Sequence, residues 1–459
     1  MSAARGGASA ATDPAATDPA ATDPAATDSA AHLAGLAAGL LAEYRHERLP
    51  APPGLAALAA GGAPFGDALD GYRAARDRLA AHLDASFEPA AAYHSMREFW
   101  DDAAAQEEGR SDRSYWDSYE NGRRRRAERV AAEAFGSEQA VLVNAGMSAL
   151  DVAVRASGLR PGDRMLVHDR MYFESRDLLD GLYAPWGVRI VAADLRDPKA
   201  VADAVGEHRP ALALAELALN GPRCDVPVLE PLRDAGVRTV LDCSALGHGV
   251  RPSALLTGPH VLYVESGMKY LTRQAGAGVV YGWDEWAAQA RLCARRTGQQ
   301  LQGRALHRLR PAEVAACRRR LAIHAARRER FAGTLSRLAP DLLVTDATSG
   351  AAGRDDLTAR AVLAGASGCM VFVRLPEGRG GDHEEAHRAI VADWARRTGA
   401  PGVRAGFGWT RTTCRAYGRD TLNTGLGECF TRVSVGIEPP EDVERAAGHL
   451  AEAAREVIG

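Results

Sequence analysis

The sequence predicts a large α/β domain with a mainly parallel sheet of about seven strands, followed by a smaller C-terminal α+β domain. Two observations predict this fold. Between Gln139 and Gly282, short apolar runs rich in β-branched residues alternate with helical stretches, a pattern typical of a mainly parallel sheet with helices on both faces. Long helical stretches rich in Arg and Ala follow, from Trp283 to about Leu338, and a shorter segment that mixes strands and helices completes the chain.

The apolar runs also give expected bounds for the elements. In the large domain we expect strands at 140–143, 164–168, 188–192, 211–216, 238–242, 261–265 and 278–281. In the C-terminal domain we expect strands at 369–375 and 430–435 and a last helix over 440–457, with Pro439 and Pro440 at its start.

The chain divides into four segments by composition. Residues 11–30 repeat Ala-Thr-Asp-Pro-Ala three times and then Ala-Thr-Asp-Ser-Ala; a Pro in almost every repeat without an apolar period predicts a disordered tail over 1–30. Apolar positions spaced three and four apart predict a helical N-terminal arm over 31–118. The large domain is then expected over 119–310, and a linker helix with the small domain over 311–459.

Composition limits the class of protein. The 459 residues are 46% hydrophobic and 25% charged, with 56 basic and 59 acidic residues and a net charge of −3. This excludes a disordered or fibrous chain and gives no reason to expect nucleic acid as a partner. No apolar run approaches the ~18 residues that cross a membrane, and the N-terminus lacks a basic segment before an apolar one. We therefore expect a cytoplasmic protein that does not bind membranes.

Lysine is almost absent from this sequence. Only Lys199 and Lys269 are lysine, and the other 54 of the 56 basic residues are arginine. Lys269 follows the expected strand 261–265 in a segment with few other charges, where an amine has a depressed pKa and can form an imine, which a guanidinium cannot do. Lys199 follows Asp197-Pro198 at a helix start, as expected of a surface lysine.

Two further strand ends carry residues suited to ligand binding, and ligands of parallel sheets bind at the carboxyl ends of the strands. The first expected strand runs into Asn144-Ala145-Gly146-Met147-Ser148 and then a helix, a turn that presents backbone N–H groups to a phosphate. The strand 238–242 ends in Asp242-Cys243-Ser244.

From about Tyr119 to the C-terminus the sequence resembles the Cys/Met-metabolism enzymes that depend on pyridoxal 5′-phosphate (PLP), which include cystathionine γ-synthase, cystathionine γ-lyase and methionine γ-lyase. Ser266-Gly267-Met268-Lys269-Tyr270 is similar to the family's Ser-x-Thr-Lys-Tyr, in which the Lys holds PLP as a Schiff base. The resemblance implies the aspartate-aminotransferase fold type and a cofactor site. Its residues would be Gly146, Met147, Tyr172, Asn220, Asp242, Ser244, Ser266 and Lys269.

The resemblance also implies individual roles. Asp242 would pair with the pyridinium nitrogen, and Tyr172, in His168-Asp169-Arg170-Met171-Tyr172, would stack on the cofactor and join Lys269 in proton transfer. Asn220 would reach the ring hydroxyl. Arg432, in Arg-Val-Ser-Val-Gly-Ile-Glu, would bind the substrate α-carboxylate.

Several positions depart from the family's pattern. Met268 stands where the family has a hydroxyl residue, and Phe173-Glu174 replaces Gly-Gly. In Gly406-Phe407-Gly408-Trp409-Thr410-Arg411-Thr412 the family's Ser and Glu are lost. The family's Tyr-x-Arg at the cofactor phosphate has no clean counterpart: Tyr115, Trp116 and Tyr119 compete for the Tyr, and the run 123–126 of arginines fits a solvated helix face better. These departures bear on the substrate more than on the cofactor.

The function that the resemblance implies is a PLP-dependent lyase or transferase. It would act on an L-amino acid with a side-chain leaving group by γ-elimination or γ-replacement, through external aldimine and quinonoid intermediates, in specialised amino-acid biosynthesis. The leaving group could be a thiol, a halide or an acyloxy group. A β-lyase and an aminotransferase are the alternatives. The resemblance also implies a homodimer or homotetramer with shared active sites.

A different class of protein is suggested by His383-Glu384-Glu385-Ala386-His387, a literal His-Glu-x-x-His zinc-protease motif. No third ligand follows at a suitable spacing, so a surface helix is the favoured interpretation and we expect no metal. The seven cysteines are odd in number and form no Cys-x-x-Cys pair, which indicates neither a disulfide framework nor a cysteine-based zinc site. A scaffold without catalysis would have no need of Lys269 and Asp242.

Overall fold

The structure is a computed structural model, and the chain forms two compact units, residues 1–100 and 101–459, which are described separately. The described residues are 24–61, 65–86, 122–250, 252–272, 276–301, 306, 309, 311–364, 368–376, 382–399, 406–418 and 428–458. The candidate phosphate ligands Tyr115, Trp116 and Tyr119 lie outside them. None of the helices in the described ranges combines the length and the apolarity needed to cross a lipid bilayer.

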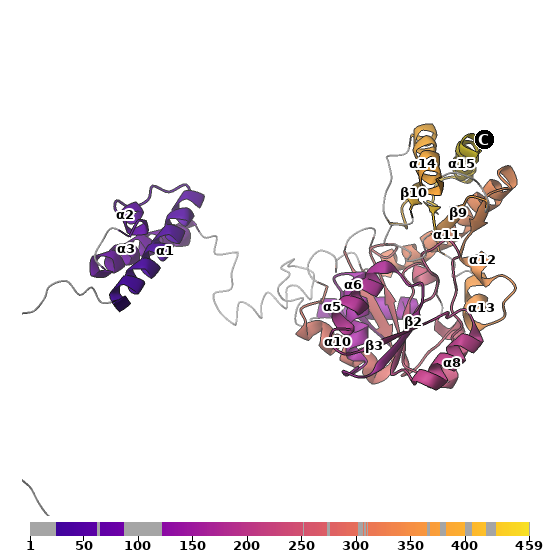
Figure 1. Ribbon diagram of the computed structural model, residues 1–459, viewed down its shortest axis with the longest axis horizontal. Helices are drawn as coiled ribbons and strands as arrows, with labels where there is room; N and C mark the ends of the chain where they lie inside the picture. Colours follow the sequence, from indigo (N-terminus) through magenta and orange to yellow (C-terminus); the bar gives the residue numbers. More distant parts are fainter. Residues whose placement is uncertain are drawn as a thin grey trace, which may run out of the picture. The chain divides into compact units, whose positions relative to one another are not determined.

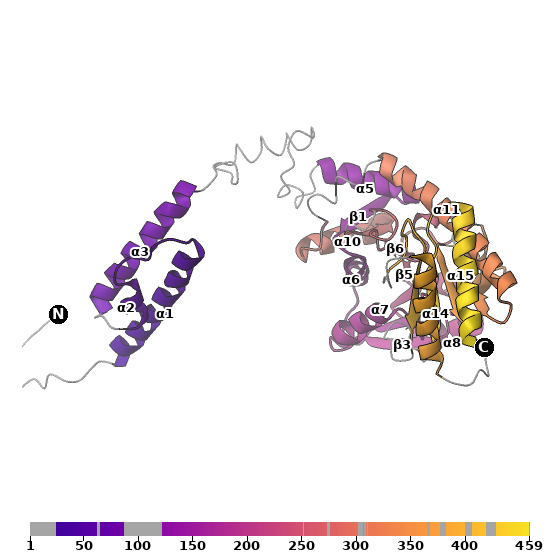
Figure 2. The same ribbon diagram turned by 90° about the horizontal axis from the view of Figure 1, so that it is seen from above.

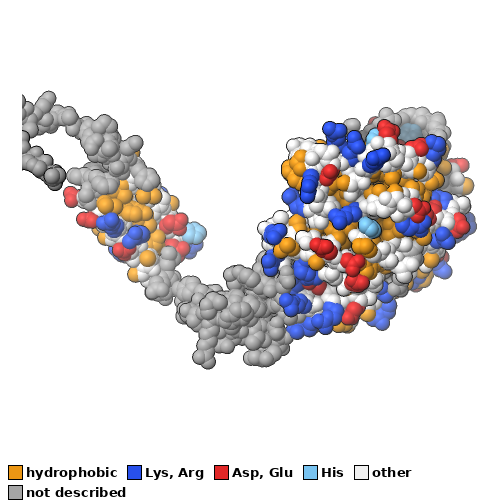
Figure 3. Space-filling view, turned by 90° about the horizontal axis from the view of Figure 1, so that it is seen from below, with side chains coloured by type: hydrophobic (Ala, Val, Ile, Leu, Met, Phe, Trp, Pro, Cys, Tyr) orange, Lys and Arg blue, Asp and Glu red, His pale blue; other side chains and the backbone are white. Residues whose placement is uncertain are grey.

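The first unit contains three helices, α1 (Pro24–His46), α2 (Leu55–Ala59) and α3 (Phe65–Ser86). They share a small core that includes Leu40, Tyr44 and Leu79, and the Tyr44 hydroxyl donates to a backbone carbonyl of α3 at 2.8 Å. Hydrophobic side chains are also visible on the face of this unit in Figure 3. Helix α1 begins inside the segment 1–30 that the sequence assigned to a disordered tail, because alanine favours helix and Pro is tolerated in a first turn.

A seven-stranded sheet forms the centre of the second unit, in the order β1-β7-β6-β5-β4-β2-β3 (Figure 1). Strands β2 to β6 run parallel, whereas β7 is antiparallel to both of its neighbours. The predicted mainly parallel sheet is therefore confirmed, with every strand within about two residues of its expected bounds. The strands are β1 (Gln139–Val143), β2 (Arg164–His168), β3 (Arg189–Ala193), β4 (Leu212–Glu216), β5 (Thr239–Asp242), β6 (Val261–Glu265) and β7 (Gly278–Gly282).

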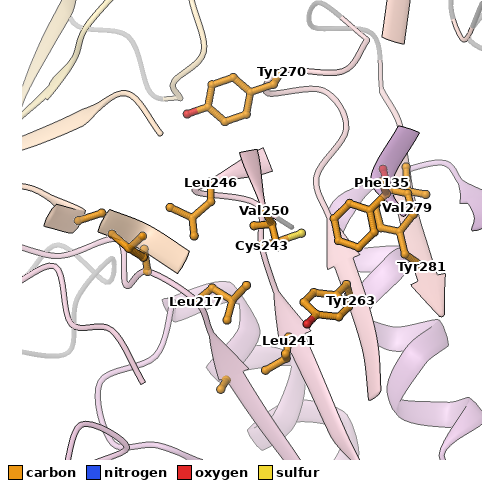
Figure 4. Packing of buried hydrophobic residues seen from close by; sticks show 14 of the residues in the cluster. Phe135, Leu217, Leu241, Cys243, Leu246, Val250, Tyr263, Tyr270, Val279 and Tyr281 are labelled. Atoms are coloured by element: carbon orange, nitrogen blue, oxygen red, sulfur yellow. The ribbon is translucent and has the colours of Figure 1, made fainter. Parts of the chain in front are cut away.

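Helices cover both faces of this sheet because its strands are apolar on both sides. Alternate residues of β1 show the division: Leu142 belongs to one buried cluster, and Val141 and Val143 belong to the other. In the first cluster, Phe135 stacks on Tyr281 with ring centroids 4.0 Å apart, beside Tyr263 (Figure 4). Four helices pack around this first cluster: α5 (Gly122–Phe135), α8 (Pro198–His208), α9 (Glu230–Asp234) and α11 (Pro311–Leu338). The second cluster is covered by α6 (Gly146–Ala156), by the π-helix Leu179–Tyr183 that continues α7 (Phe173–Leu178), and by α10 (Asp284–Arg296).

The arginine run at 123–126 is only partly the solvated face that the sequence favoured. Arg124 is buried and lies 3.8 Å from Glu128 one turn further along α5, whereas Arg125 and Arg126 are exposed. Helical spacing places Arg124 and Glu128 on the side of α5 that packs on the sheet. Elsewhere in the second unit, acidic and basic side chains are interspersed over the surface seen in Figure 3.

The smaller C-terminal domain is built on a four-stranded antiparallel sheet with the order β10-β11-β9-β8. Long helices pack together beside it, with α15 between α11 and α14 (Figure 2). The two expected strands and the last helix are confirmed. The sequence missed β8 and β10, which are short or interrupted by polar residues. The elements are β8 (Leu343–Thr345), α12 (Ala347–Ala351), α13 (Leu357–Leu363), β9 (Met370–Arg374), α14 (His383–Thr398), β10 (Thr413–Tyr417), β11 (Phe430–Ser434) and α15 (Pro440–Ile458).

Candidate active site

The carboxyl ends of β4, β5 and β6 bring the central residues of the candidate site together. In the parallel register, Glu216 at the end of β4 is paired with Asp242 at the end of β5, and Asp242 is paired with Val264 of β6. Lys269 follows four residues after the last residue of β6. The sheet thus places two carboxylates next to each other, close to the turn that carries the lysine.

Asp242 is a carboxylate without a cationic partner among the described residues. Its Oδ1 accepts a hydrogen bond from the backbone N–H of Ser244 at 2.8 Å. Burial raises the pKa of Asp242, the bonds from Ser244 lower it in part, and the charge of Glu265 raises it again. A carboxylate in this setting is stabilised by a bound cation, since an opposite charge offsets the cost of desolvation.

Lys269 lies in a partly buried position against an aromatic ring. Its Nζ is 5.1 Å from the ring centroid of Phe407, a contact that suits an ammonium group. Burial lowers the pKa of the Lys269 amine, Arg432 lowers it further, and Glu174 opposes them. The backbone of Lys269 also packs closely against Gly408, where φ is +77°. A Cβ at Gly408 would stand 2.2 Å from the Lys269 carbonyl oxygen, so a larger residue would not fit there.

The start of α6 packs against Ser266, which is hydrogen-bonded to Ser244. Ala145 at the helix N-cap makes no side-chain capping bond, so the first N–H groups of the helix remain available to a ligand. Gly146 packs so tightly on Ser266 that a Cβ would lie 2.7 Å from the Ser266 Cβ. The Ser266 N–H donates to the Ser244 Oγ at 2.8 Å, which joins the turn after β5 to the turn after β6. Met147 is partly exposed at the same helix start.

Arg432 reaches the site from β11 of the small domain. It is 5% exposed; its Nη1 donates to the Asn220 Oδ1 at 3.0 Å, and its Nη2 to the Gly406 carbonyl at 3.3 Å. The guanidinium lies 5.0 Å from the ring centroid of Tyr417. Within the described residues it has no ion pair, and burial lowers its pKa. Asn220, expected at the ring hydroxyl of the cofactor, contacts this arginine.

Tyr172 stands immediately before α7 and is tied to two carboxylates. Its hydroxyl donates to Glu174 Oε2 at 2.9 Å, and its backbone N–H donates to Glu216 Oε1 at 2.5 Å. Burial and, next, the hydrogen bond to Glu174 raise the pKa of the Tyr172 phenol well above its usual value. The phenol is therefore held in its protonated form at neutral pH.

Sequence reasoning missed the parts that Glu216, Glu174 and Phe407 play in this geometry. Burial and the neighbouring Asp242 raise the pKa of Glu216 to about 8, so this carboxyl is largely protonated at neutral pH. A signal for Glu216 was present, because it ends the strand next to the one that ends in Asp242. Glu174 and Phe407 had no such signal, since their contacts depend on how loops and α7 fold back over the sheet.

Lys199 and the His-Glu-x-x-His segment lie in settings of a different kind. Lys199 is on the surface of α8, paired with Asp203. His387 is buried in α14 with its Nδ1 2.9 Å from the Thr431 Oγ1. Within the described ranges, the group that could hold a metal contains neither histidine of the motif: it consists of His168, Asp169 and Asp194. Arg196 already pairs with Asp194 there at 2.6 Å.

The order of the strands in this sheet, with a lysine just past the end of β6 and a small domain behind it, is the architecture of PLP-dependent enzymes of the aspartate-aminotransferase fold type. Residues 83–309 match the model of the Cys/Met metabolism PLP-dependent enzymes, the family that the sequence resembles. The predicted resemblance, fold class and cofactor are thereby confirmed.

Individual proteins are also similar to this chain. The protein YhfS of Escherichia coli (strain K12), described as uncharacterized, is 34% identical over 122 residues, 26% of this chain. That match spans 32%, about a third, of the length of YhfS. Among solved structures, a cystathionine gamma synthase from Xanthomonas oryzae pv. oryzae is similar with a TM-score of 0.61 and 24% identity, covering 73% of this chain and 87% of that one. The methionine gamma lyase CalE6 from Micromonospora echinospora gives 0.60 and 22%, with the same coverage. At these identities the two structures show a shared fold.

The residues present fit PLP. The pyridine ring would supply the cation that Asp242 lacks, the phosphate would suit the uncapped start of α6 beside Ser266, and the aldehyde would require an amine such as that of Lys269. The tight packing of Gly146 on Ser266 leaves a side-chain-free backbone at the phosphate end.

Proposed function

We propose that this protein is a PLP-dependent enzyme that acts on an L-amino acid carrying a leaving group on its side chain, by γ-elimination or γ-replacement. The observation that carries the proposal is the setting of Lys269: a partly buried amine with a lowered pKa, near the strand end that carries Asp242, and subject to the charge of Arg432 from the small domain. A specialised biosynthetic role is proposed with it, because the residues that depart from the family pattern, such as Glu174, contact the candidate catalytic groups.

The cofactor-binding residues are proposed to be Gly146, Met147, Tyr172, Asn220, Asp242, Ser244, Ser266 and Lys269. When bound, PLP draws electrons away from the α-carbon of the amino acid. Asp242 would hold the proton on the ring nitrogen, since its carboxylate has no other cationic partner among the described residues. The amides at the start of α6 and the Ser266 hydroxyl bind the phosphate.

Lys269 has two tasks, attachment of the cofactor and movement of a proton. Its pKa is lowered mainly by burial, so that a larger share of the amine is neutral at physiological pH than for an exposed lysine. A neutral amine is a nucleophile that would hold the cofactor, and when it is free it can accept the proton of the substrate α-carbon at Nζ.

Arg432 and Tyr172 act on the two sides of the substrate. The Arg432 guanidinium already donates to neutral oxygens at 3.0 and 3.3 Å, and a substrate α-carboxylate is a stronger acceptor in the same plane. Tyr172 keeps its proton at neutral pH and can donate it to a departing group. Binding by Arg432 therefore orients the α-carbon toward Lys269 and leaves the side chain for Tyr172.

The direct test is a product assay. The purified protein with PLP is incubated with L-amino acids that carry thiol, acyloxy or halide groups at the β or γ carbon, and ammonia and 2-oxo acid are measured. Release of both from γ-substituted substrates, without an added 2-oxo acid, is the expected result. Release from β-substituted substrates alone would make the protein a β-lyase. Turnover that requires a 2-oxo acid as amino acceptor would make it an aminotransferase and overturn the proposal.

Assembly and location are part of the proposal. We propose a homodimer or homotetramer with shared active sites that works in the cytoplasm on a small-molecule substrate. All seven cysteines are free in the structure, as is usual in a reducing compartment. Light scattering of the purified protein gives the mass directly, and a monomer would contradict shared sites.

A further inference from the structure

Glu174 contacts the hydroxyl of Tyr172, and its charge influences the amine of Lys269. Its Oε2 accepts the Tyr172 hydroxyl proton at 2.9 Å, and this is the hydrogen bond that the described residues make to its carboxylate. The same negative charge favours the protonated form of Lys269, opposing Arg432. One side chain at the start of α7 thus influences both the phenol and the amine.

Other charged groups around α7 form ion pairs with one another, and Asp177 is exposed. On α7 and its π-helical continuation, Arg176 pairs with Asp180 at 2.6 Å. On the neighbouring α6, Asp151 pairs with Arg155 at 2.8 Å.

Two further groups act on the phenol. Arg432, from β11, favours its ionisation, and Glu216, from β4, opposes it. With a pKa of about 8, Glu216 carries little charge at neutral pH. Glu174 is therefore the carboxylate that the Tyr172 hydroxyl faces and to which it donates.

We propose that Glu174 is a positioning residue, whose carboxylate accepts the Tyr172 hydroxyl and fixes its direction, so that Tyr172 serves as the acid of the reaction while Lys269 serves as its base. The part played in turnover rests on the proposed function. In that step the Lys269 Nζ takes a proton from the substrate carbon next to the one that carries the leaving group, and the electron pair of that C–H bond forms a carbon–carbon double bond. The bond to the leaving heteroatom breaks, the heteroatom keeps its electron pair and takes the proton from the Tyr172 Oη, and the phenolate regains a proton from water.

The test uses the two lysines of the chain and needs neither cofactor nor substrate. The full-length protein without PLP is labelled with an amine-reactive reagent over a range of pH, and peptide mass mapping compares Lys269 with Lys199, the internal reference. Removal of a nearby negative charge lowers the pKa of an amine, so Glu174→Gln should shift the labelling of Lys269 to lower pH by about half a unit or more. Asp177→Asn, an exposed change of the same charge on the same helix, should leave it unchanged.

A second experiment measures the titration of Tyr172 itself. The ultraviolet absorbance of tyrosinate is titrated in the parent protein and in Glu174→Gln, each with its Tyr172→Phe counterpart subtracted. The absorbance change that remains after this subtraction comes from Tyr172, and it should occur at lower pH in Glu174→Gln than in the parent protein. If Lys269 and Tyr172 both titrate in Glu174→Gln as they do in Asp177→Asn, the positioning role is overturned.

The loaded enzyme separates this proposal from the proposed function. Glu174→Gln should lower kcat about 10- to 100-fold with little change in KM, and it should shift the alkaline limb of the pH profile to lower pH. An unchanged kcat and pH profile would overturn the role of Glu174 in turnover. If the parent protein neither binds PLP nor turns over, the proposed function fails, but the labelling and tyrosinate titrations still decide the effect of Glu174 on the two groups.

Discussion

The two lysines of this chain show how strongly the surroundings decide what an amine can do. Lys199 lies on α8 with 80% of its side chain exposed and pairs with Asp203 one helical turn away, which raises its pKa. Lys269 lies beyond β6 against Phe407, and its pKa is lowered by burial and by Arg432. The same side chain is a solvated cation in one place and a candidate nucleophile in the other.

The difference originates in the fold. An exposed helix surface lets a lysine find an acidic partner within its own helix. A strand end under a second domain removes water and places other cations nearby, which disfavours the charged amine. Each prediction below changes one of these surroundings, and they are ordered from the largest expected effect to the smallest.

Replacement of the lysines themselves gives the largest contrast. Lys269→Arg should lower turnover by at least about 10³-fold, because a guanidinium can neither form the covalent link to the cofactor nor accept the α-proton. Lys199→Arg should keep parental activity and thermal stability. Steady-state assays of ammonia release on both variants check this prediction, and equal losses in the two would contradict it.

The next prediction concerns Asp242, the carboxylate proposed to face the ring nitrogen of the cofactor. Asp242→Asn should lower kcat about 10²-fold or more, because the ring nitrogen loses its charged partner. Without cofactor, the same variant should be as stable as the parent or more so, since burial disfavours the Asp242 carboxylate. Thermal denaturation without PLP, run beside the activity assay, separates the two effects. A variant that is both inactive and unfolded would show instead that Asp242 is needed for folding.

The next prediction concerns Arg432, the residue that the small domain contributes to the site. Arg432→Gln should raise KM for the amino acid about 10- to 100-fold, as expected for loss of a charged hydrogen bond worth roughly 1.5–3 kcal/mol. It should also raise the pKa of Lys269, because Arg432 lowers it. Arg411→Gln, an exposed change nearby, is the control. If Lys269 titrates at the same pH in both variants, Arg432 does not influence the pKa of Lys269.

The buried carboxyl of Glu216 is expected to make the free energy of unfolding depend on pH. The folded protein keeps a proton on Glu216 up to about pH 8, whereas the unfolded chain releases it near 4.5. Between these values the folded state binds more protons, so this carboxyl makes the free energy of unfolding fall as pH rises. Glu216→Gln should therefore gain stability relative to the parent from about pH 5 to about pH 8 and level off above, by on the order of 1–4 kcal/mol.

Denaturant titrations across this range measure that difference. Glu133→Gln, an exposed glutamate on α5, is the matched control and should show no such trend. A constant difference between Glu216→Gln and the parent at every pH would mean that Glu216 does not titrate there.

The sequence predicted the sheet well because each of its strands is an apolar run bounded by turns, and Lys269 was found because lysine is so rare in this chain. The contacts around these residues could not be predicted in the same way. Asn220 meets Arg432 only because β11 of the small domain comes against the turn after β4, and Phe407 reaches Lys269 from a loop more than a hundred residues away. Glu174 is two residues from Tyr172, but a local hydrogen bond of this kind has no pattern in sequence.

The most direct measurement for the difference between the two lysines is borohydride reduction of the protein with PLP, followed by peptide mass mapping. We expect a yellow protein that keeps one pyridoxyl group on Lys269 and none on Lys199. A label on Lys199, or a colourless protein with no label on either lysine, would contradict the assignment of Lys269 as the residue that holds the cofactor.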